Sequence, residues 1–215
     1  MNHKTATLER LPVGSEHIEG MLELPENAKS IVLFAHGSGS SRHSKRNKYV
    51  ARVLQQSGIA TFLMDLLTPE EDANYPTRFD IPLLTHRLLA ATQWIKSDPR
   101  TCQLPVGYFG ASTGAAAALQ AAAGYGGEIG AVVSRGGRPD MAGRSALEKV
   151  ESATLLLVGG WDTEVIKLNQ EAYEFLRCQK ALTIIPEATH LFTEPGALEE
   201  AARLATLWFE QYLTA

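Results

Sequence analysis

The feature that most constrains the fold is the run Gly110-Ala111-Ser112-Thr113-Gly114 near the middle of the chain. It stands between a strand-like apolar run at residues 104–109 and a helix-like run at residues 115–123. On so sharp a strand-to-helix turn a serine hydroxyl is exposed above the sheet, and glycines on either side let the two backbones approach closely. The context therefore predicts a nucleophile elbow, with Ser112 as the candidate covalent nucleophile.

Short, nearly continuous apolar runs recur along the chain, as in strands that are buried on both faces of a parallel sheet. They comprise residues 31–35, 59–67, 106–109, 131–133, 155–158 and 182–185. Before them, residues 5–11 and 18–24 alternate between apolar and polar side chains, which predicts an antiparallel hairpin at the sheet edge. With helical patterns between most runs, the chain is predicted to be α/β, with about eight mostly parallel strands and helices on both faces.

Two amphipathic helices are predicted from apolar residues at helical spacing. Their buried stripes are Leu84, Leu88, Ala91 and Ile95 in the first helix, and Leu198, Ala201, Leu204 and Trp208 in the second. Further helices are expected near residues 49–56 and 164–176. The connection between Ser134 and Ala153 is too short for a lid domain, and residues 68–80 are expected to form a long loop that could overhang the site.

The composition is ordinary for a soluble globular protein, with 45% hydrophobic and 20% charged residues. A length of 215 residues suits a single domain, residues 1–215. The 20 basic and 24 acidic residues give a net charge of −4, so no nucleic-acid partner is expected, and no apolar run is long enough for a membrane span. The amino terminus has no apolar signal segment, which favours a cytoplasmic location.

The two cysteines, Cys102 and Cys178, are too few for a disulfide framework and lack the paired spacing of a zinc site. We expect both to be reduced and structural. No metal and no organic cofactor is expected, and the expected partner is a small-molecule substrate, bound by a monomer or homodimer.

A serine hydroxyl is a weak nucleophile until a base takes its proton, and a third group must orient that base. Asp162 and His190 follow the last two predicted strands, so both are expected at the carboxyl edge of the sheet. The order Ser112, Asp162, His190 is the order that this elbow normally takes. The pattern therefore predicts a Ser-His-Asp triad.

Each triad partner has a structural alternative. Asp162 could cap the helix that begins near Thr163, with Glu164 as the rival acid. His190 could be a surface residue at the start of the last helical region. His43 is a competing base, whereas His36 is expected to hydrogen-bond its own loop.

An oxyanion hole is predicted from two backbone N–H groups. One comes from the residue after the nucleophile, Thr113, and the other from the small, flexible loop at residues 36–41, most directly from Ser38. The Gly37-Ser38-Gly39 piece of this loop lacks the third glycine of a dinucleotide-binding fingerprint, which would fall at Arg42.

Three further residues are candidates for substrate binding. Arg135 ends a predicted strand next to the elbow and could grip a carboxylate in bidentate fashion, while an ion pair with Asp140 or Asp162 fits it equally well. Arg42 opens a basic run to Lys48 that is typical either of a solvated helix start or of a phosphate or carboxylate contact. Trp161 precedes Asp162 in the turn after its strand.

Taken together, His36-Gly37, the elbow around Ser112, Asp162 and His190 resemble the α/β-hydrolase superfamily, and most closely the dienelactone hydrolase family. The resemblance covers nearly the whole chain. It implies a compact eight-stranded sheet without a lid and the hydrolysis of lactones or esters, often small and anionic, by a triad at the matching positions. Dienelactone hydrolases proper have cysteine at the elbow, so the serine here fits a general carboxylesterase or thioesterase equally well.

Two functions are therefore expected from different classes. The first is a serine hydrolase that cleaves a small ester, lactone or thioester through an acyl-enzyme on Ser112. The second is a non-catalytic ligand-binding protein that uses the same fold and pocket as a receptor.

Overall fold

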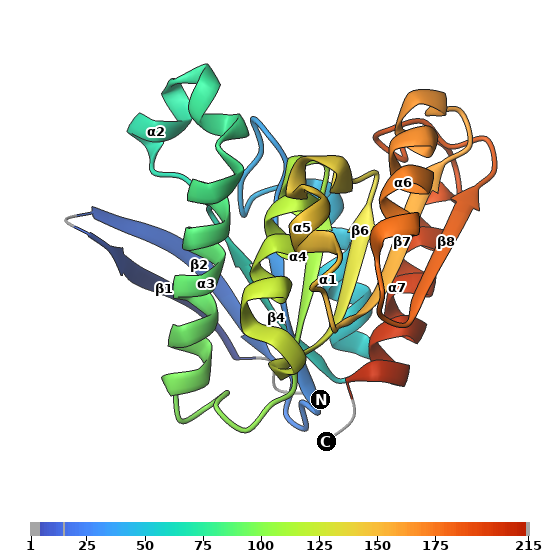
Figure 1. Ribbon diagram of the computed structural model, residues 1–215. Coiled ribbons are helices and arrows are strands. Elements are labelled where there is room, and N and C mark those ends of the chain that lie inside the picture. Colours follow the sequence, from blue (N-terminus) through green and yellow to red (C-terminus); the bar gives the residue numbers. More distant parts are fainter. Residues whose placement is uncertain (1–4, 15, 214–215) are drawn as a thin grey trace.

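One eight-stranded sheet forms the centre of the molecule, with helices on both faces (Figure 1). The computed structural model describes residues 5–14 and 16–213. The strand order is β1-β2-β4-β3-β5-β6-β7-β8. The strands are β1 (Thr5–Val13), β2 (Glu16–Leu24), β3 (Ser30–Ala35), β4 (Ile59–Met64), β5 (Val106–Ala111), β6 (Ile129–Arg135), β7 (Ala153–Gly159) and β8 (Lys180–Ile185).

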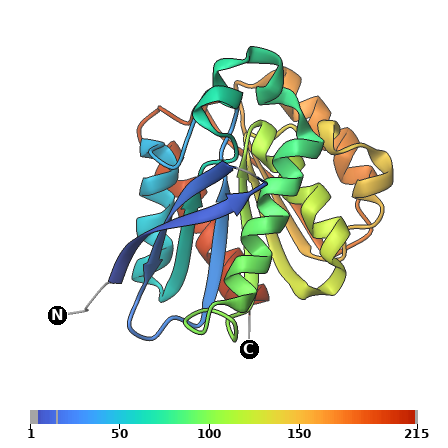
Figure 2. The ribbon, with the colours of Figure 1, turned by 90° about the vertical axis from the view of Figure 1, so that its left-hand side faces the viewer.

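Strand β2 pairs antiparallel with both β1 and β4, and every other pair of neighbours is parallel. Figure 2 shows the β1–β2 hairpin at the edge of the sheet, as its alternating pattern predicts. The predicted α/β class with a mostly parallel sheet is therefore confirmed. Residues 1–4 lie outside the described part of the chain. The fold does not test the cytoplasmic location, which stays a prediction.

The central strands are buried on both faces, which explains their continuous apolar runs. In β3, Ile31 and Leu33 contribute to one core layer, and Val32 and Phe34 to the other. Strand β8 is different because it is the outer strand of the sheet. Of its six residues only Ile185 is fully buried, so its apolar run indicated more burial than an edge strand has.

The helices form a layer on each side of the sheet. In Figure 1, α3, α4, α5 and α6 cover the front face, while α1 and α7 pack against each other behind it. The helices are α1 (Lys45–Gln56), α2 (Pro69–Ala73), α3 (Ile81–Ser97), α4 (Thr113–Tyr125), α5 (Arg144–Leu147), α6 (Thr163–Phe175) and α7 (Ala197–Tyr212), and the 3-10 helices are η1 (Tyr75–Phe79), η2 (Gly126–Glu128) and η3 (Pro139–Ala142).

The predicted buried stripe of α3 is confirmed. The buried face of α7 is rotated by part of a turn from the predicted one. All four predicted α3 residues are buried. In α7, Ala201 is buried as predicted, but Leu198, Leu204 and Trp208 are only partly buried. The fully buried face of α7 is made largely of alanines together with Phe209. Small side chains let this helix lie close to the sheet, and the large ones cover the flanks of the contact.

Residues 68–80 are not the long loop that was expected, because they form α2 and η1. Thr68 Oγ1 accepts a hydrogen bond from the Glu71 N–H, and the Glu71 carboxylate accepts one from the Thr68 N–H. This is a capping box with Pro69 at the first helical position. The signal was present in the sequence as Thr-Pro-Glu-Glu.

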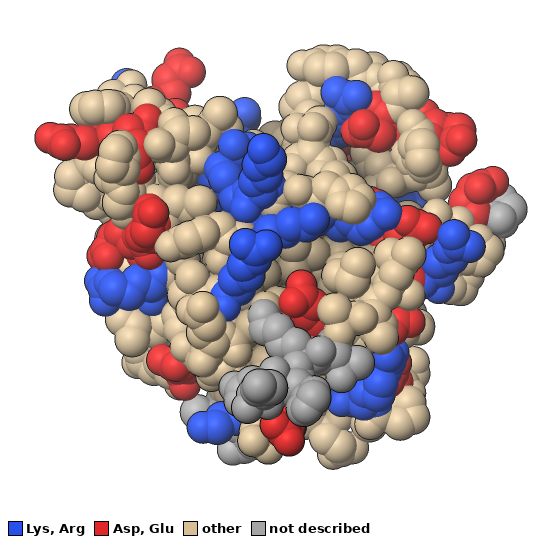
Figure 3. Space-filling model, turned by 180° about the vertical axis from the view of Figure 1, so that it is seen from behind, with Lys and Arg blue, Asp and Glu red and all other residues tan. Residues whose placement is uncertain are grey.

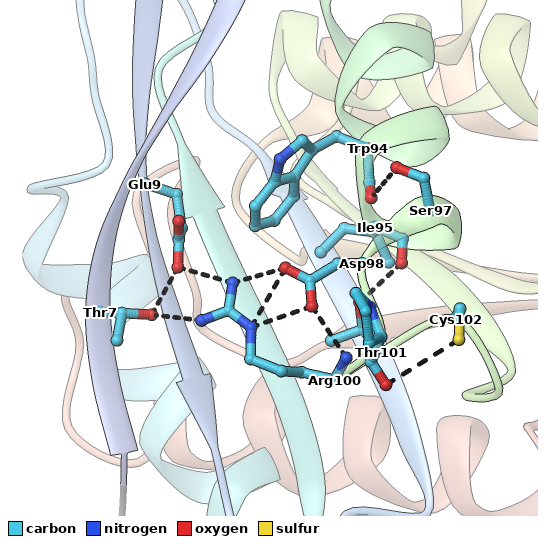
Figure 4. Close-up of polar contacts among 10 residues, drawn as sticks. Thr7, Glu9, Trp94, Ile95, Ser97, Asp98, Arg100, Thr101 and Cys102 are labelled. Carbon is cyan, nitrogen blue, oxygen red and sulfur yellow. Dashed lines mark hydrogen bonds and ion pairs between the residues drawn. The ribbon is translucent and has the colours of Figure 1, made fainter.

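The edge hairpin is tied to the rest of the sheet through Arg100, in the turn after α3 (Figure 4). The Arg100 guanidinium donates hydrogen bonds to both carboxylate oxygens of Asp98 and to Glu9 Oε1 on β1, the last at 2.8 Å. These bonds raise the pKa of Arg100 and lower the pKa of Asp98. The network links β1 to the turn that leads into β5, the strand of the elbow.

The connection between β6 and β7 contains only η3 and α5, in agreement with the expected absence of a lid. Within residues 5–14 and 16–213, no helix is long and apolar enough to cross a membrane.

Candidate active site

Ser112 lies on a sharp turn between β5 and α4, as the elbow pattern predicts. Its backbone angles, φ 50° and ψ −123°, fall in a region that side chains rarely occupy. A Cβ at Gly110 would lie 2.4 Å from Ala115 Cα, and one at Gly114 would lie 2.2 Å from the Ala35 carbonyl oxygen. Both glycines are therefore required by the close approach of strand and helix.

The loops after β7 and β8 are joined by backbone hydrogen bonds. The Gly160 N–H donates to the Ile185 carbonyl at 2.8 Å, and the Trp161 N–H donates to the Ala188 carbonyl at 3.0 Å. A Cβ at Gly159 would lie 2.4 Å from the Ala188 oxygen. Residues far apart in the sequence are thus held side by side at the carboxyl edge of the sheet.

This arrangement brings Asp162 to His190. His190 Nδ1 lies 2.7 Å from Asp162 Oδ2. The Asp162 side chain makes no helix-capping hydrogen bond, so the capping alternative is wrong. Glu164 is exposed, and in the described part of the chain the acid that pairs with His190 is Asp162. With Nδ1–H donating to the carboxylate, Nε2 of His190 is left as the proton acceptor.

Ser112 and His190 line the same pocket, which has a volume of about 210 Å³. In the described part of the chain the Ser112 hydroxyl has no hydrogen-bond partner, so its contact with His190 is not formed in this state. Catalytic hydrogen bonds are commonly long before substrate binds. The pocket is smaller than the 300–1,000 Å³ or so of a drug-sized ligand site, which fits a small substrate.

The two residues of the predicted oxyanion hole are adjacent, although their hydrogen bonding differs from the expectation. The Ser38 N–H donates to Thr113 Oγ1 at 2.9 Å. The Ser38 amide is therefore occupied by a side chain in this state. The Thr113 N–H lies at the amino end of α4, where helix N–H groups have no partner within the helix.

His36 holds the loop that carries Ser38, as expected. Its Nδ1 lies 2.9 Å from the Gly37 carbonyl, and its Nε2 accepts a hydrogen bond from the Leu66 N–H at 3.0 Å. Nδ1 must therefore carry the proton in the neutral ring. Burial lowers the pKa of His36, while the Gly37 carbonyl and the charges of Asp65 and Asp72 oppose this effect.

Arg135 is the last residue of β6 and lies in register with Ala111, the residue before Ser112. It lines the pocket but is only 5% exposed. Its Nε and Nη1 atoms have no hydrogen-bond partner. Burial, and to a smaller extent the like charge of Arg46, lowers the pKa of Arg135 to about 10. The group is thus a buried cation at neutral pH, with its guanidinium carbon 5.4 Å from the centre of the Phe192 ring.

The alternative prediction, an ion pair of Arg135 with Asp140 or Asp162, is wrong. Asp140 pairs with Arg138 at 2.8 Å, and Asp162 pairs with His190. No acidic side chain in the described part of the chain forms an ion pair with Arg135.

Two predicted binding residues lie away from this pocket. Arg42 forms ion pairs with Asp65 and Glu19 and lines a separate hollow of about 510 Å³ beside the β1–β2 hairpin. Trp161 is 61% exposed and does not line the pocket around Ser112. The structure therefore does not bring Arg42 and Trp161 into the pocket that Ser112 and His190 line.

Arg46 and Asn47 of α1 also line the pocket, and neither was predicted individually from the sequence. The only signal for them was the basic run to which Arg46 belongs. Glu194 was not predicted either; its carboxylate accepts hydrogen bonds from the Thr189 N–H and hydroxyl next to His190. No cluster of three metal-ligating side chains is present among the described residues.

A nucleophile elbow over a mostly parallel sheet, with an Asp-His pair on the following strand ends, defines an α/β-hydrolase fold. The chain belongs to the dienelactone hydrolase family, whose model matches residues 18–213. It is 55% identical to the crystal structure of a dienelactone hydrolase from Anabaena variabilis, with a TM-score of 0.94 over 98% of this chain and 99% of that one.

Two further comparisons differ in sequence identity and in the share of each chain that they cover. The chain is 56% identical over 200 residues to two Mycobacterium tuberculosis proteins that are provisionally named phosphoribosyl transferases; the match covers 93% of this chain but only 45% of theirs. A dienelactone hydrolase-like promiscuous phosphotriesterase from metagenomic libraries is 19% identical, with a TM-score of 0.79 over 99% of both chains. The second likeness is one of fold alone.

Proposed function

We propose that this chain is a serine hydrolase that cleaves a small ester, lactone or thioester through an acyl-enzyme on Ser112. The observation that carries the proposal is the hydrogen bond between His190 Nδ1 and Asp162 beside the strained elbow serine. With Nδ1–H donating to the carboxylate, His190 Nε2 is unprotonated in the neutral ring, as a general base requires. The family to which the chain belongs supports a hydrolase, and the choice of a serine nucleophile rests on the residue at the elbow.

The reaction has two halves. Ser112 Oγ attacks the carbonyl carbon while His190 Nε2 takes the hydroxyl proton, and Asp162 stabilises the imidazolium that forms. The tetrahedral intermediate collapses, the bond to the leaving oxygen or sulfur breaks, and His190 returns the proton to that atom. Water then attacks the acyl-enzyme with His190 again as the base, which releases the acid and restores Ser112.

The Thr113 and Ser38 N–H groups are the proposed donors to the oxyanion. Because the Ser38 amide donates to Thr113 Oγ1 in the free protein, this bond must be exchanged for one to the substrate oxygen. Removal of one oxyanion-hole donor costs about 10²- to 10³-fold in kcat in a well-studied hydrolase. A threonine hydroxyl that holds the amide in place would position the donor before substrate arrives.

Our proposal does not carry the transferase name of the mycobacterial relatives over to this chain. The match covers 45% of each of those proteins, and the dienelactone hydrolase model covers almost the whole of the matching chain here. We therefore propose hydrolysis, not transfer, as the reaction of this chain.

Labelling with a fluorophosphonate probe tests the proposal. The protein should be labelled once, at Ser112, and S112A should abolish labelling in a folded sample. D162N should label at least tenfold more slowly, because an amide cannot stabilise the imidazolium. E164Q is the matched control, since it removes an exposed acid two residues away, and it should label at the wild-type rate.

Labelling at another serine would overturn the triad. A folded protein that takes up no probe and hydrolyses no p-nitrophenyl ester of short chain length would favour the alternative, a ligand-binding protein. A normal D162N enzyme together with a slow E164Q enzyme would transfer the role of the acid to Glu164.

A further inference from the structure

Two arginines at the pocket around Ser112 have no acidic partner. Arg135 and Arg46 both line it, and neither forms an ion pair in the described part of the chain. Arg135 is 5% exposed, with Nε and Nη1 buried and unbonded, and the Nε of Arg46 is likewise buried and unbonded. By contrast, Arg138 and Arg42, close by in the sequence, are both paired with carboxylates.

An unpaired buried cation is costly. Removing such an ion from water remains unfavourable even after the protein relaxes, and stable proteins normally offset this cost with a counter-charge. The ring of Phe192 beside Arg135 offsets only part of this cost, since a cation–π contact is weaker than a charge-assisted hydrogen bond to a counter-ion. The missing counter-charge therefore points to an anionic ligand.

The amino end of α1 adds further positive character to the same pocket. Ser44, the N-cap residue, and Asn47 both line the pocket, and the Ser44 side chain caps only the Asn47 N–H. The N–H groups of Lys45 and Arg46 have no acceptor in the described part of the chain. Helix amino ends bind anions through such free N–H groups and through the helix dipole.

The surface around the pocket is also positively charged. Between Glu26 and Asp65 the sequence contains no acidic residue, and α1 with its preceding turn contributes several basic ones. Figure 3 shows lysine and arginine side chains gathered in the middle of the face that α1 covers, below the hollow at the upper edge. Basic side chains around a cleft raise the local concentration of an anionic ligand.

We propose that the pocket binds a phosphate monoester group of the substrate, held by Arg135, Arg46 and the amino end of α1, next to the acyl bond that Ser112 attacks. This inference rests on the proposed hydrolase function and names the class of its substrate, a small phosphorylated ester, lactone or thioester. Two unpaired guanidinium groups match the two negative charges of a phosphate monoester. A single carboxylate would leave one of them uncompensated, and it has fewer oxygens to reach both arginines and the helix.

Calorimetry tests this site without turnover. Titration with inorganic phosphate, n-butyl phosphate and pentanoate, at constant ionic strength, should give saturable binding in the order n-butyl phosphate, inorganic phosphate, pentanoate. R135M and R46M should each weaken the binding of n-butyl phosphate by about ten- to a hundredfold, as expected for the loss of charge-assisted hydrogen bonds. K45M is the matched control, since it removes an exposed cation from the same turn of α1, and its affinity should stay within twofold.

The melting temperature supplies a second readout. R135M should melt at a higher temperature than wild type in phosphate-free buffer, because it removes an uncompensated buried charge, and n-butyl phosphate should raise the melting temperature of wild type but not that of R135M. If R135M does not fold, R46M and the wild-type titrations decide the question. Wild type that binds n-butyl phosphate no more tightly than pentanoate would overturn the proposal, as would equal affinities in R46M and K45M.

The source of the phosphate is distinguished by competition. n-Butyl phosphate should inhibit the hydrolysis of p-nitrophenyl butyrate competitively, whereas a site for free phosphate would bind inorganic phosphate more tightly and leave the KM unchanged, which would overturn the substrate assignment. Because calorimetry also works with S112A, the two proposals fail separately. Phosphate binding without any esterase activity would remove only the hydrolase, and esterase activity without phosphate binding would remove only the anion site.

Discussion

At the scale of single residues, the proposed nucleophile is held in a conformation that a side chain disfavours. Ser112 has φ 50° and ψ −123°, a combination that glycine adopts readily because it has no Cβ. Such strain costs on the order of 1–3 kcal/mol and persists only where the surroundings impose it. Here the close contacts of Gly110 and Gly114 with neighbouring backbone impose this conformation on the turn.

This strain predicts that S112G is more stable than S112A, although glycine usually destabilises. Relief of about 1–3 kcal/mol of strain outweighs the roughly 0.5–1 kcal/mol of extra backbone entropy that glycine loses on folding. The free energy of unfolding from urea titration should therefore be about 1 kcal/mol higher for S112G. Equal stabilities, or a more stable S112A, would mean that the turn is not strained.

How far the sequence predicts the site depends on whether a residue's role is set locally. Ser112, Asp162 and His190 each follow a predicted strand, so strand ends alone place them at one edge. Arg42 could not be placed in this way. It pairs with Glu19 and Asp65, both 23 residues away and on other elements, and a pattern along the chain does not reveal such partners.

At the scale of elements, the loop between β8 and α7 fixes the position of His190. The Glu194 carboxylate accepts hydrogen bonds from the Thr189 N–H at 2.9 Å and from the Thr189 hydroxyl at 2.7 Å. These bonds lower the pKa of Glu194. Because Thr189 immediately precedes His190, Glu194 is a positioning residue for the proposed base.

The expected effect of E194Q is a two- to tenfold lower kcat with little change in KM. The neutral amide accepts only with its oxygen, so the charge-assisted hydrogen bonds that hold Thr189 are weakened. E199Q, an exposed acid in the first turn of α7, is the control and should behave as wild type. A merely structural role would instead lower the melting temperature of E194Q and leave the kcat of the folded fraction unchanged.

The buried faces of the elements are likewise only partly predictable from the sequence. The strands were predictable because burial on both faces requires continuous apolar runs. The stripe of α7 was not, since its alanines occupy the closest contact with the sheet and its larger residues lie at the sides. Apolar spacing gives the face of a helix only to within a residue or two when both large and small apolar side chains are present.

At the scale of the whole molecule, His36 joins two neighbouring strand ends and so links the site to global stability. It follows β3, and its Nε2 accepts the N–H of Leu66 beyond the end of β4. Protonation would remove this acceptor and place a charge in a buried position. The pKa of His36 is lowered for the same reason: burial, the largest cause, disfavours the charged ring.

The sign of the resulting pH dependence follows from linkage. His36 has a lower pKa in the folded protein than the value of about 6.5 in an unfolded chain, so the unfolded state binds the proton more readily. Its contribution to stability is therefore complete above about pH 6.5 and is lost progressively as the pH falls below that value, by up to about 1.4 kcal/mol per pH unit. We expect the free energy of unfolding of wild type, measured by urea titration, to decrease from pH 7 to pH 5.

H36Q should flatten this decrease, because the amide oxygen can accept the Leu66 N–H and does not titrate. H86Q is the matched control, since His86 is exposed on α3 and its removal should leave the wild-type slope. The comparison matters because other groups also titrate in this range, and only a change of slope specific to H36Q assigns the effect to the buried ring. Parallel slopes for wild type and H36Q would show that His36 is not the group that couples acid pH to unfolding.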